Sequence, residues 1–221
     1  MPELDQLTVD RTAHRAHVRV PAGATTGVVV LHAWWGLNDD VVAYADRLAD
    51  EGFGVLAPDM FGGQTATRIE DAERLSSEGD EGAPPIVVAA VDALGEHLPS
   101  DAPLAVLGFS FGAAYAIWAP SDRPRLAASV AYYGTYYGDF LARSQAPLLG
   151  HFAADDPYEP EESVKALEDA LRDAGRRAEI HRYPGTGHWF AEPSRDAYRA
   201  DAAELAFRRT VDFLRRELAS G

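Results

Sequence analysis

The sequence predicts an α/β protein with a mostly parallel central sheet and helices on both of its faces. Short aliphatic runs alternate with longer helical stretches along the chain, as in successive βαβ units. Two of these runs, 28–31 and 104–107, are continuously apolar, which is typical of strands covered by helices on both faces. No segment rich in Pro, Gly or Ser divides the chain, so we expect a single domain, 1–221, with no separate lid domain.

The elements expected from these patterns follow one another in a regular order. Strands are predicted at 17–20, 27–33, 53–57, 104–109, 127–133, 147–152 and 178–183. Helices are predicted at 39–51, 69–77, 84–97, 111–119, 160–174 and 194–219. Gly52 and Gly175 each follow a helix where a C-terminal capping glycine is common. The segment 76–85 is predicted to be a flexible loop within the domain.

Composition limits the class of partner. The chain has 20 Lys and Arg against 35 Asp and Glu, a net charge of −15, which disfavours binding to nucleic acid or to an anionic membrane. It has no cysteine, which excludes disulfides and thiolate metal sites. Residues 1–5 lack a secretory pattern, and no apolar run approaches the ~18 residues of a membrane span. We therefore expect a cytoplasmic protein, and the sequence does not predict its oligomeric state.

The strongest chemical signal is the pentapeptide 108–112, in which glycines stand two residues before and after Ser110. It follows a predicted strand and opens a predicted helix. Glycines at these positions permit a sharp turn that projects the serine hydroxyl at a helix N-terminus. The alternative is a structural βα turn, but the strand–turn–helix context favours the nucleophile of a serine hydrolase. We therefore predict an α/β-hydrolase fold with Ser110 as its nucleophile.

A serine hydroxyl needs an adjacent base, and in this fold the chain order is Ser, then an acid, then His. His188 lies in a glycine-containing loop after the last predicted strand, which makes it the predicted general base. His181 falls within a strand pattern and His151 precedes the acid, so both are interpreted as structural.

The acid is expected after the predicted strand 147–152, where Asp155 and Asp156 are adjacent. Asp156 is the preferred residue to orient His188, whereas Asp155 suits a turn in which its side chain bonds nearby backbone N–H groups. Asp59 precedes Ser110 in the chain and is only a further alternative. His151 is close in sequence to both aspartates, but no established ligand spacing such as H-E-x-x-H is present, so no metal site is predicted.

An oxyanion hole requires two backbone N–H donors. The residue after the nucleophile, Phe111, supplies one, and Trp34 in the loop 32–38 is the candidate for the other. Four aromatic residues are predicted to contact the substrate: Trp35, Phe109, Tyr133 and Trp189. Ordinary packing is the alternative for the tryptophan pair and for the tyrosine-rich segment 132–137.

The stretches 31–39, 45–49 and 52–63, with the pentapeptide and 187–191, resemble the dienelactone hydrolase family over nearly the whole chain. The resemblance implies hydrolysis of an ester or lactone through an acyl-enzyme, with no metal or organic cofactor. It also implies a small-molecule substrate as the partner. By this resemblance Ser110, Asp156 and His188 occupy the triad positions, and Trp34 and Phe111 the oxyanion positions.

Three positions depart from the family pattern. Ser110 stands where well-known members have cysteine, and Ala33 where they have a glutamate that controls the ionisation of the thiol. The two changes are consistent, because a hydroxyl is deprotonated only as it attacks. Glu192 replaces an arginine that holds the carboxylate of dienelactone and would repel such a group, so we expect a neutral or apolar ester instead. A thioesterase, acyltransferase or small peptidase, or a catalytically silent binding protein, are the alternatives.

Overall fold

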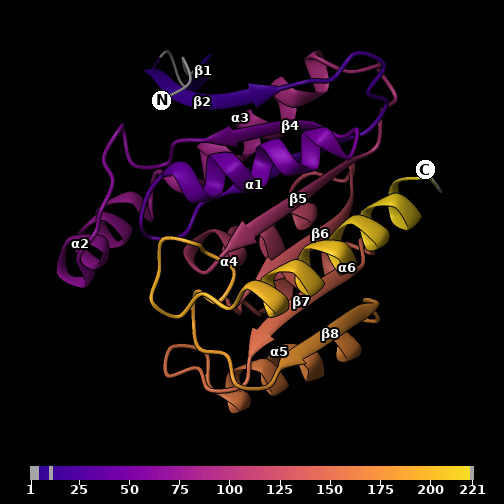
Figure 1. The fold of residues 1–221 in the computed structure, drawn as a ribbon. Coiled ribbons are helices and arrows are strands. Elements are labelled where there is room, and N and C mark those ends of the chain that lie inside the picture. Colours follow the sequence, from indigo (N-terminus) through magenta and orange to yellow (C-terminus); the bar gives the residue numbers. More distant parts are fainter. Residues whose placement is uncertain (1–4, 10–11, 220–221) are drawn as a thin grey trace.

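Eight strands form one sheet in the order β1-β2-β4-β3-β5-β6-β7-β8 in the computed structural model, which describes residues 5–9 and 12–219 (Figure 1). The strands are β1 (Asp5–Val9), β2 (Thr12–Arg19), β3 (Gly27–Leu31), β4 (Gly54–Pro58), β5 (Leu104–Phe109), β6 (Leu126–Tyr132), β7 (Leu148–Ala153) and β8 (Ala178–Tyr183). All neighbours from β4 to β8 pair in parallel, whereas β2 pairs antiparallel with both β1 and β4. The predicted mostly parallel sheet is confirmed.

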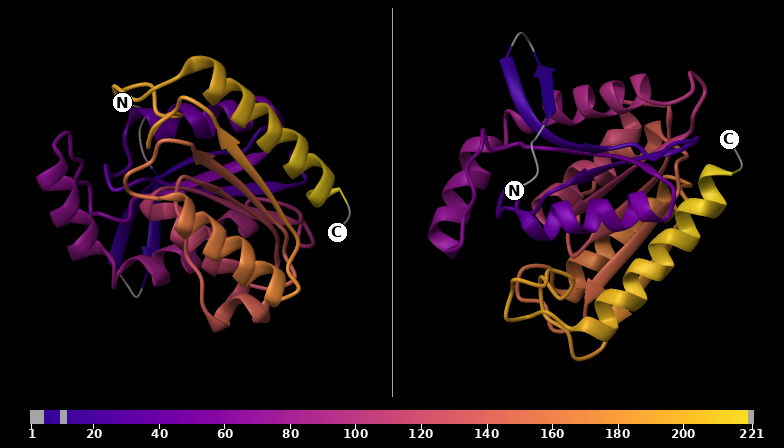
Figure 2. Two further views of the ribbon diagram at one scale, coloured as in Figure 1. Left: turned by 90° about the horizontal axis from the view of Figure 1, so that it is seen from below. Right: turned by 45° about the horizontal axis from the view of Figure 1, so that its top comes forward.

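Helices cover both faces of this sheet, as predicted (Figure 2). Their bounds are α1 (Asp39–Asp50), α2 (Ile69–Gly79), α3 (Ala83–Glu96), α4 (Phe111–Trp118), α5 (Glu161–Asp173) and α6 (Ala200–Leu218). Helices α1 and α6 lie on one face, α3, α4 and α5 lie on the other, and α2 lies at the periphery. None of the helices within residues 5–9 and 12–219 has the length and apolarity required to cross a bilayer.

Burial explains why the central strands read as unbroken apolar runs. Every residue of β3, β4 and β5 is buried, because helices pack on both sides of these strands. At the helix termini, Asn38 caps α1 by accepting a hydrogen bond from the Val41 N–H at 3.1 Å. Gly52 and Gly175 adopt left-handed φ values of 97° and 69° after α1 and α5, so both predicted capping positions are confirmed.

Several boundaries differ from the sequence prediction, most by one or two residues, and β2 begins at Thr12 instead of residue 17. Strand β1 was not predicted, because only Leu7 and Val9 in it are buried and an edge strand this short gives a weak pattern. The segment 76–85 is not an open loop, since α2 continues to Gly79 and α3 begins at Ala83. Helix α6 begins at Ala200 instead of residue 194, and Ser194 before it is hydrogen-bonded to Asp40 of α1.

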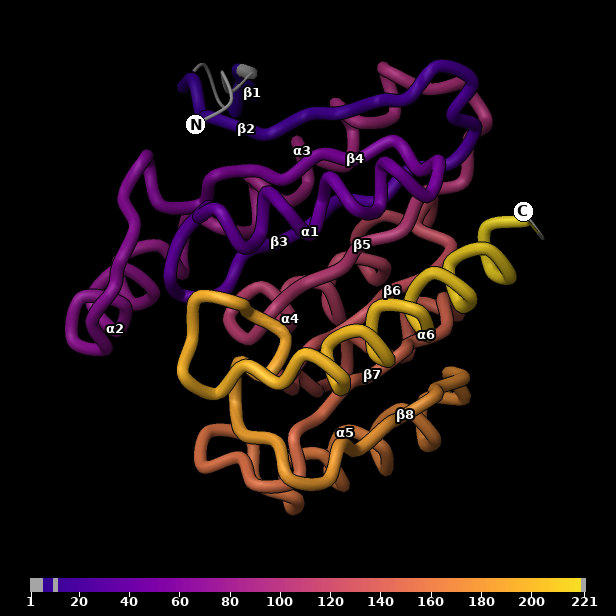
Figure 3. The backbone as a smooth tube through the Cα atoms, in the orientation of Figure 1, coloured from indigo at the N-terminus to yellow at the C-terminus, as the bar shows by residue number. Residues whose placement is uncertain are grey.

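The parallel register brings the carboxyl ends of distant strands to one edge of the sheet, where open α/β sheets bind their ligands. Strands β3, β5, β7 and β8 all end at this edge. The segments that follow them lie together there, including the long connection from β8 to α6 (Figure 3). Any site assembled from these segments joins residues that are far apart in the sequence.

Candidate active site

Ser110 occupies the sharp turn between β5 and α4. Its backbone has φ 48° and ψ −110°, a conformation that non-glycine residues rarely adopt. A β-carbon on Gly112 would lie 2.6 Å from the backbone oxygens of Leu31 and His32, and one on Gly108 would collide with the carbonyl of Gly112. Only glycine therefore allows α4 to approach the ends of β3 and β5 this closely.

The structure brings Ser110, His188 and Asp156 together in one chain of hydrogen bonds. The Ser110 Oγ lies 2.9 Å from His188 Nε2, and His188 Nδ1 lies 2.7 Å from Asp156 Oδ2. The carboxylate is an acceptor, so Nδ1 carries the proton that it receives and Nε2 is left to accept from the serine hydroxyl. His188 is 5% exposed and Asp156 is 9% exposed, so bulk water competes little with these bonds.

Asp156 is held in place by the turn in which it lies. Its Oδ1 accepts hydrogen bonds from the N–H groups of Tyr158 and Glu159, at 2.9 and 3.0 Å, which directs Oδ2 at His188. Asp155 has an exposed side chain, and only its backbone N–H is bonded, to the Thr186 carbonyl at 3.0 Å. The side-chain turn role expected of Asp155 is thus performed by Asp156, and that expectation for Asp155 was wrong.

The other predicted alternatives lie apart from this chain of bonds. Asp59 is buried after β4 and accepts from the N–H groups of Phe61 and Gly63. His151 is buried in β7, with Nδ1 2.8 Å from the Tyr183 hydroxyl and Nε2 3.0 Å from the Thr210 hydroxyl. Burial lowers the pKa of His151 well below its usual value.

His181 of β8 stacks on His151 at 5.9 Å between ring centroids, so both histidines serve packing, as expected. Both ring nitrogens of His151 are hydrogen-bonded to hydroxyl groups, so neither is available to bind a metal ion together with Asp155 and Asp156. Across the part of the chain that the structure describes, no three His, Cys, Asp or Glu side chains are grouped to hold a metal ion.

Two backbone donors are free beside the nucleophile. The Phe111 N–H is at the first residue of α4, where no helical acceptor exists. The Trp34 N–H follows β3, and among the described residues neither N–H has a hydrogen-bond acceptor. Neither N–H is therefore used by the described part of the fold, and their role as oxyanion donors stays a prediction.

Tyr158 and Trp189 pack against His188, and Trp34 packs against both of them. The Tyr158 ring lies 4.9 Å from the His188 ring, 5.1 Å from Trp189 and 5.6 Å from Trp34, and Tyr158 is 44% exposed. Trp189 has a left-handed φ of 65°, an uncommon strain for a bulky residue. Sequence reasoning missed Tyr158, although its position two residues after Asp156 on the same turn was a usable signal.

Of the four aromatic residues predicted to contact substrate, only Trp189 keeps exposed surface. Phe109 points into the core, with its ring 4.9 Å from both Tyr44 and Tyr132, so the prediction for Phe109 was wrong. Trp35 and Tyr133 are buried as well, so the prediction that they contact the substrate is not supported either. Trp35 packs behind Trp189 at 5.2 Å, and the Tyr133 ring lies 5.1 Å from the His188 ring, so they support the site from within.

Glu192 is an acid buried next to these rings. It is 2% exposed, its Oε1 accepts from the Tyr133 hydroxyl at 2.9 Å, and its Oε2 has no partner among the described residues. Burial raises its pKa to about 8, with a smaller contribution from Asp40, while the Tyr133 bond and Arg195 oppose the rise. The carboxyl is thus mostly protonated at neutral pH, and the charge repulsion expected from Glu192 is not supported.

The replacement Glu192→Gln is expected to remove a pH dependence of stability. Between the ordinary value of 4.5 and about 8 the unfolded chain releases the Glu192 proton while the folded chain retains it. The free energy of unfolding therefore falls as pH rises through this window. Glutamine is neutral at every pH and can still accept from Tyr133, so the variant should gain roughly 3 kcal/mol over the wild type between pH 5.5 and 8.5.

Urea denaturation at pH 5.5, 7 and 8.5 measures this gain. Glu73→Gln, which removes an exposed carboxyl on α2, is the matched control and should give no comparable trend. A stability difference between Glu192→Gln and the wild type that stays constant over this range would contradict a buried, protonated Glu192.

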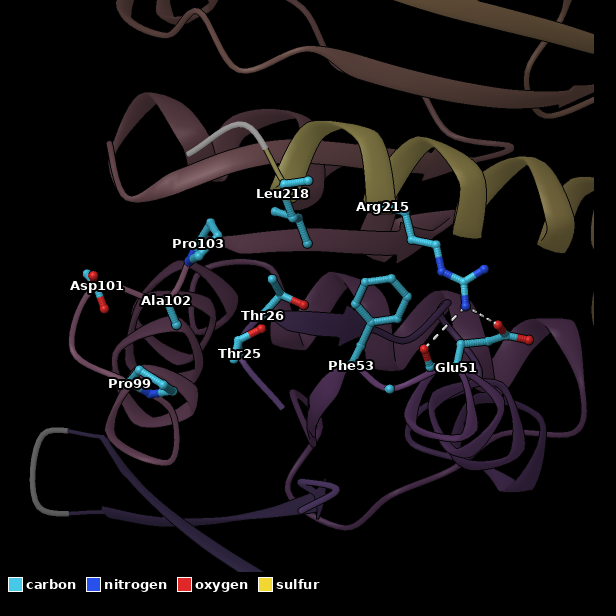
Figure 4. Close-up of a pocket in the computed structure, with 12 residues that line it drawn as sticks. Thr25, Thr26, Glu51, Phe53, Pro99, Asp101, Ala102, Pro103, Arg215 and Leu218 are labelled. Carbon is cyan, nitrogen blue, oxygen red and sulfur yellow. Dashed lines mark hydrogen bonds and ion pairs between the residues drawn. The ribbon is translucent and has the colours of Figure 1, made fainter. Parts of the chain in front are cut away.

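A separate cavity lies at the opposite, amino edge of the sheet (Figure 4). It has a volume of about 480 Å³ and is bordered by the residues that precede β3, β4 and β5 and by the end of α6. Its charged pair is Arg215 and Glu51, joined at 2.6 Å. None of Ser110, Asp156 and His188 borders it, so this cavity is separate from the candidate active site.

Comparison with known proteins gives matches to one family, in sequence and in structure. Residues 14–218 match the sequence model of the dienelactone hydrolase family. A protein of Salmonella typhi with the provisional name carboxymethylenebutenolidase is 28% identical, covering 92% of this chain and 82% of its own. A Bradyrhizobium sp. protein, provisionally named 2-oxo-3-(5-oxofuran-2-ylidene)propanoate lactonase, is 29% identical over 89% and 86%. The crystal structure of P91, a dienelactone hydrolase-like promiscuous phosphotriesterase from metagenomic libraries, has a TM-score of 0.86 at 25% identity and 97% coverage of both chains.

Proposed function

The chain belongs to the dienelactone hydrolase family and is an ester or lactone hydrolase, and we propose that it acts through a serine-bound acyl-enzyme. The observation that carries this proposal is the chain of hydrogen bonds from Ser110 through His188 to Asp156, at 2.9 and 2.7 Å. These distances are within the range expected for hydrogen bonds between a nucleophile and its base, and between the base and the residue that orients it. The strained backbone at Ser110 supports the same reading.

In the proposed first half-reaction, the Ser110 Oγ attacks the carbonyl carbon while His188 Nε2 takes the hydroxyl proton. The N–H groups of Trp34 and Phe111 bind the oxyanion of the tetrahedral intermediate. Asp156 holds the imidazole in its tautomer and stabilises the imidazolium. The intermediate collapses when His188 protonates the leaving alcohol, which leaves the acyl group on Ser110.

In the second half-reaction, His188 accepts a proton from water, and the resulting hydroxide attacks the acyl carbonyl. The same two N–H groups bind the second oxyanion. His188 then returns the proton to Ser110 as the carboxylic acid leaves. A lactone follows the same path: ring opening leaves a hydroxyacyl group on Ser110, and water then releases the hydroxy acid.

We propose a neutral ester or lactone with an apolar group as the substrate. The support is the aromatic surface of Trp34, Tyr158 and Trp189 beside His188, which offers apolar area with no fixed positive charge among the three rings. A flat apolar group can stack on such rings. The burial of Glu192 removes a fixed negative charge from the same region at neutral pH.

The proposal is tested by trapping the acyl-enzyme. A short-chain nitrophenyl ester should give a burst of nitrophenol of about one equivalent when deacylation is the slower step, and a fluorophosphonate probe should label Ser110. Mass spectrometry of the digested protein locates the modified residue. Turnover of the ester without any labelling of Ser110, or labelling of another serine, would overturn the serine assignment.

A further inference from the structure

His32 is a buried side chain whose role the mechanism above leaves open. It follows β3 directly, is the first residue of the loop 32–38 that carries Trp34, and is completely buried. Its Nδ1 lies 2.7 Å from the Ala33 carbonyl oxygen, and its Nε2 lies 3.0 Å from the backbone N–H of Met60 in the loop after β4. The ring also packs edge-on against Phe61, with 4.7 Å between centroids.

The two partners determine the tautomer of His32. The Met60 N–H can only donate, so Nε2 must be the unprotonated acceptor. Nδ1 therefore carries the proton and donates it to the Ala33 carbonyl, which can only accept. Burial lowers the pKa of His32 to about 4, so the neutral ring and both bonds persist across the working range of a hydrolase.

The hydrogen bond from His32 Nδ1 to the Ala33 carbonyl fixes the orientation of the peptide that joins Ala33 and Trp34. The Ala33 carbonyl is turned toward His32 and also accepts from the Gly36 N–H at 3.2 Å. The peptide is trans, and in a trans peptide the C=O and the following N–H point in opposite directions. The Trp34 N–H therefore points away from His32, and within the described residues it meets no acceptor.

The same region lies directly against the nucleophile turn. The hypothetical β-carbon of Gly112 would touch the His32 carbonyl oxygen at 2.6 Å, so the end of β3 and the start of α4 are in backbone contact. The Trp34 ring stacks with Trp189, the residue after His188, at 5.8 Å. A rotation of the Ala33–Trp34 peptide would therefore occur close to the turn that carries Ser110 and to the residue that follows His188.

We propose that His32 is a positioning residue, which holds the Ala33–Trp34 peptide so that the Trp34 N–H faces the oxyanion. The inference rests on the proposed serine mechanism, because it assigns a task to one of the two oxyanion donors. It extends the site to the loop after β4, since Met60 holds the ring through Nε2. Buried Asp59 accepts from the N–H groups of Phe61 and Gly63 and in turn fixes that loop.

Two replacements separate the bonds of His32. An asparagine amide N–H can take the place of Nδ1 and keep the bond to Ala33, but it cannot reach Met60. A glutamine oxygen can take the place of Nε2 and accept from Met60, while the bond to Ala33 is lost. We expect His32→Gln to lower kcat roughly 10- to 100-fold with KM within about twofold, and His32→Asn to keep kcat within about fivefold.

A transition-state analogue distinguishes positioning from general loss of structure. The inhibition constant of a trifluoromethyl ketone should rise in His32→Gln by about the factor by which kcat/KM falls, since both depend on the oxyanion donors. The pH at which the acid limb of kcat/KM falls should not move, because His188 and Asp156 are untouched. A structural role alone would lower the melting temperature and activity of both variants in parallel.

The outcomes separate this inference from the proposed function. If the fluorophosphonate fails to label Ser110 in the wild type, the serine mechanism itself is wrong. If the wild type is labelled but His32→Gln retains the wild-type kcat, only the role of His32 is overturned. If His32→Gln does not fold, His32→Asn provides the test. This variant keeps a donor to the Ala33 carbonyl, so a loss of kcat of about 100-fold in it would also overturn the proposed role of His32.

Discussion

Replacing Ser110 with alanine is expected to lower kcat/KM for a short-chain nitrophenyl ester by roughly 10⁴- to 10⁶-fold. The hydroxyl is the proposed attacking group and lies 2.9 Å from His188 Nε2, and no other hydroxyl bonds to this imidazole within the described residues. The oxyanion donors and the binding surface remain in the variant, so a small residual acceleration over water should persist. The burst of nitrophenol should disappear.

Ser121→Ala is the matched control for this experiment. Ser121 lies in the turn after α4, its hydroxyl has no partner among the described residues, and it is outside the proposed site. Its kcat/KM should stay within about twofold of the wild type, because a substitution that removes no bond rarely changes function. Retention of more than about a tenth of the activity by Ser110→Ala, with the variant folded, would exclude the proposed nucleophile.

Asp156→Asn is expected to lower kcat by roughly 10³- to 10⁴-fold without unfolding the protein. The backbone N–H groups of Tyr158 and Glu159 point at the Oδ1 position and would retain the amide oxygen there. The amide nitrogen would then face His188 Nδ1 and could only donate to it. This would favour the tautomer that is protonated at Nε2, which cannot accept the proton of Ser110.

The adjacent aspartate provides the control. Asp155→Asn changes the same charge one residue away, but its side chain is exposed and is bonded to no described residue. Its kcat should remain within about twofold of the wild type. Steady-state kinetics of the two variants, with melting temperatures, test the assignment, and a larger loss in Asp155→Asn than in Asp156→Asn would reverse it.

The elements that sequence analysis predicted best are those whose signal is local. The apolar runs of β3 and β5 are buried as expected, and β5 and β8 have the predicted bounds. The start of α6 was misplaced by six residues. Ser194 there is bonded to Asp40 of α1 through its N–H at 3.2 Å, a contact that no local pattern discloses.

The sequence by itself determined the fold class and the three residues of the proposed triad. Gly108 is required within the turn itself, because a β-carbon there would collide with the Gly112 carbonyl four residues on, and the pentapeptide is recognisable in the sequence alone. Ser110, Asp156 and His188 were predicted from their order along the chain and from their positions after predicted strands, and the sequence contains both.

Only the tertiary structure decided which groups are turned toward this site and which are buried. It showed that Phe109 packs in the core, that Tyr158 lies beside His188, and that Glu192 loses contact with water. It also showed the His32 ring between Ala33 and Met60, from two different loops. Burial and side-chain direction result from packing between segments far apart in the chain, and the free energies involved depend on those partners, so no local pattern can specify them.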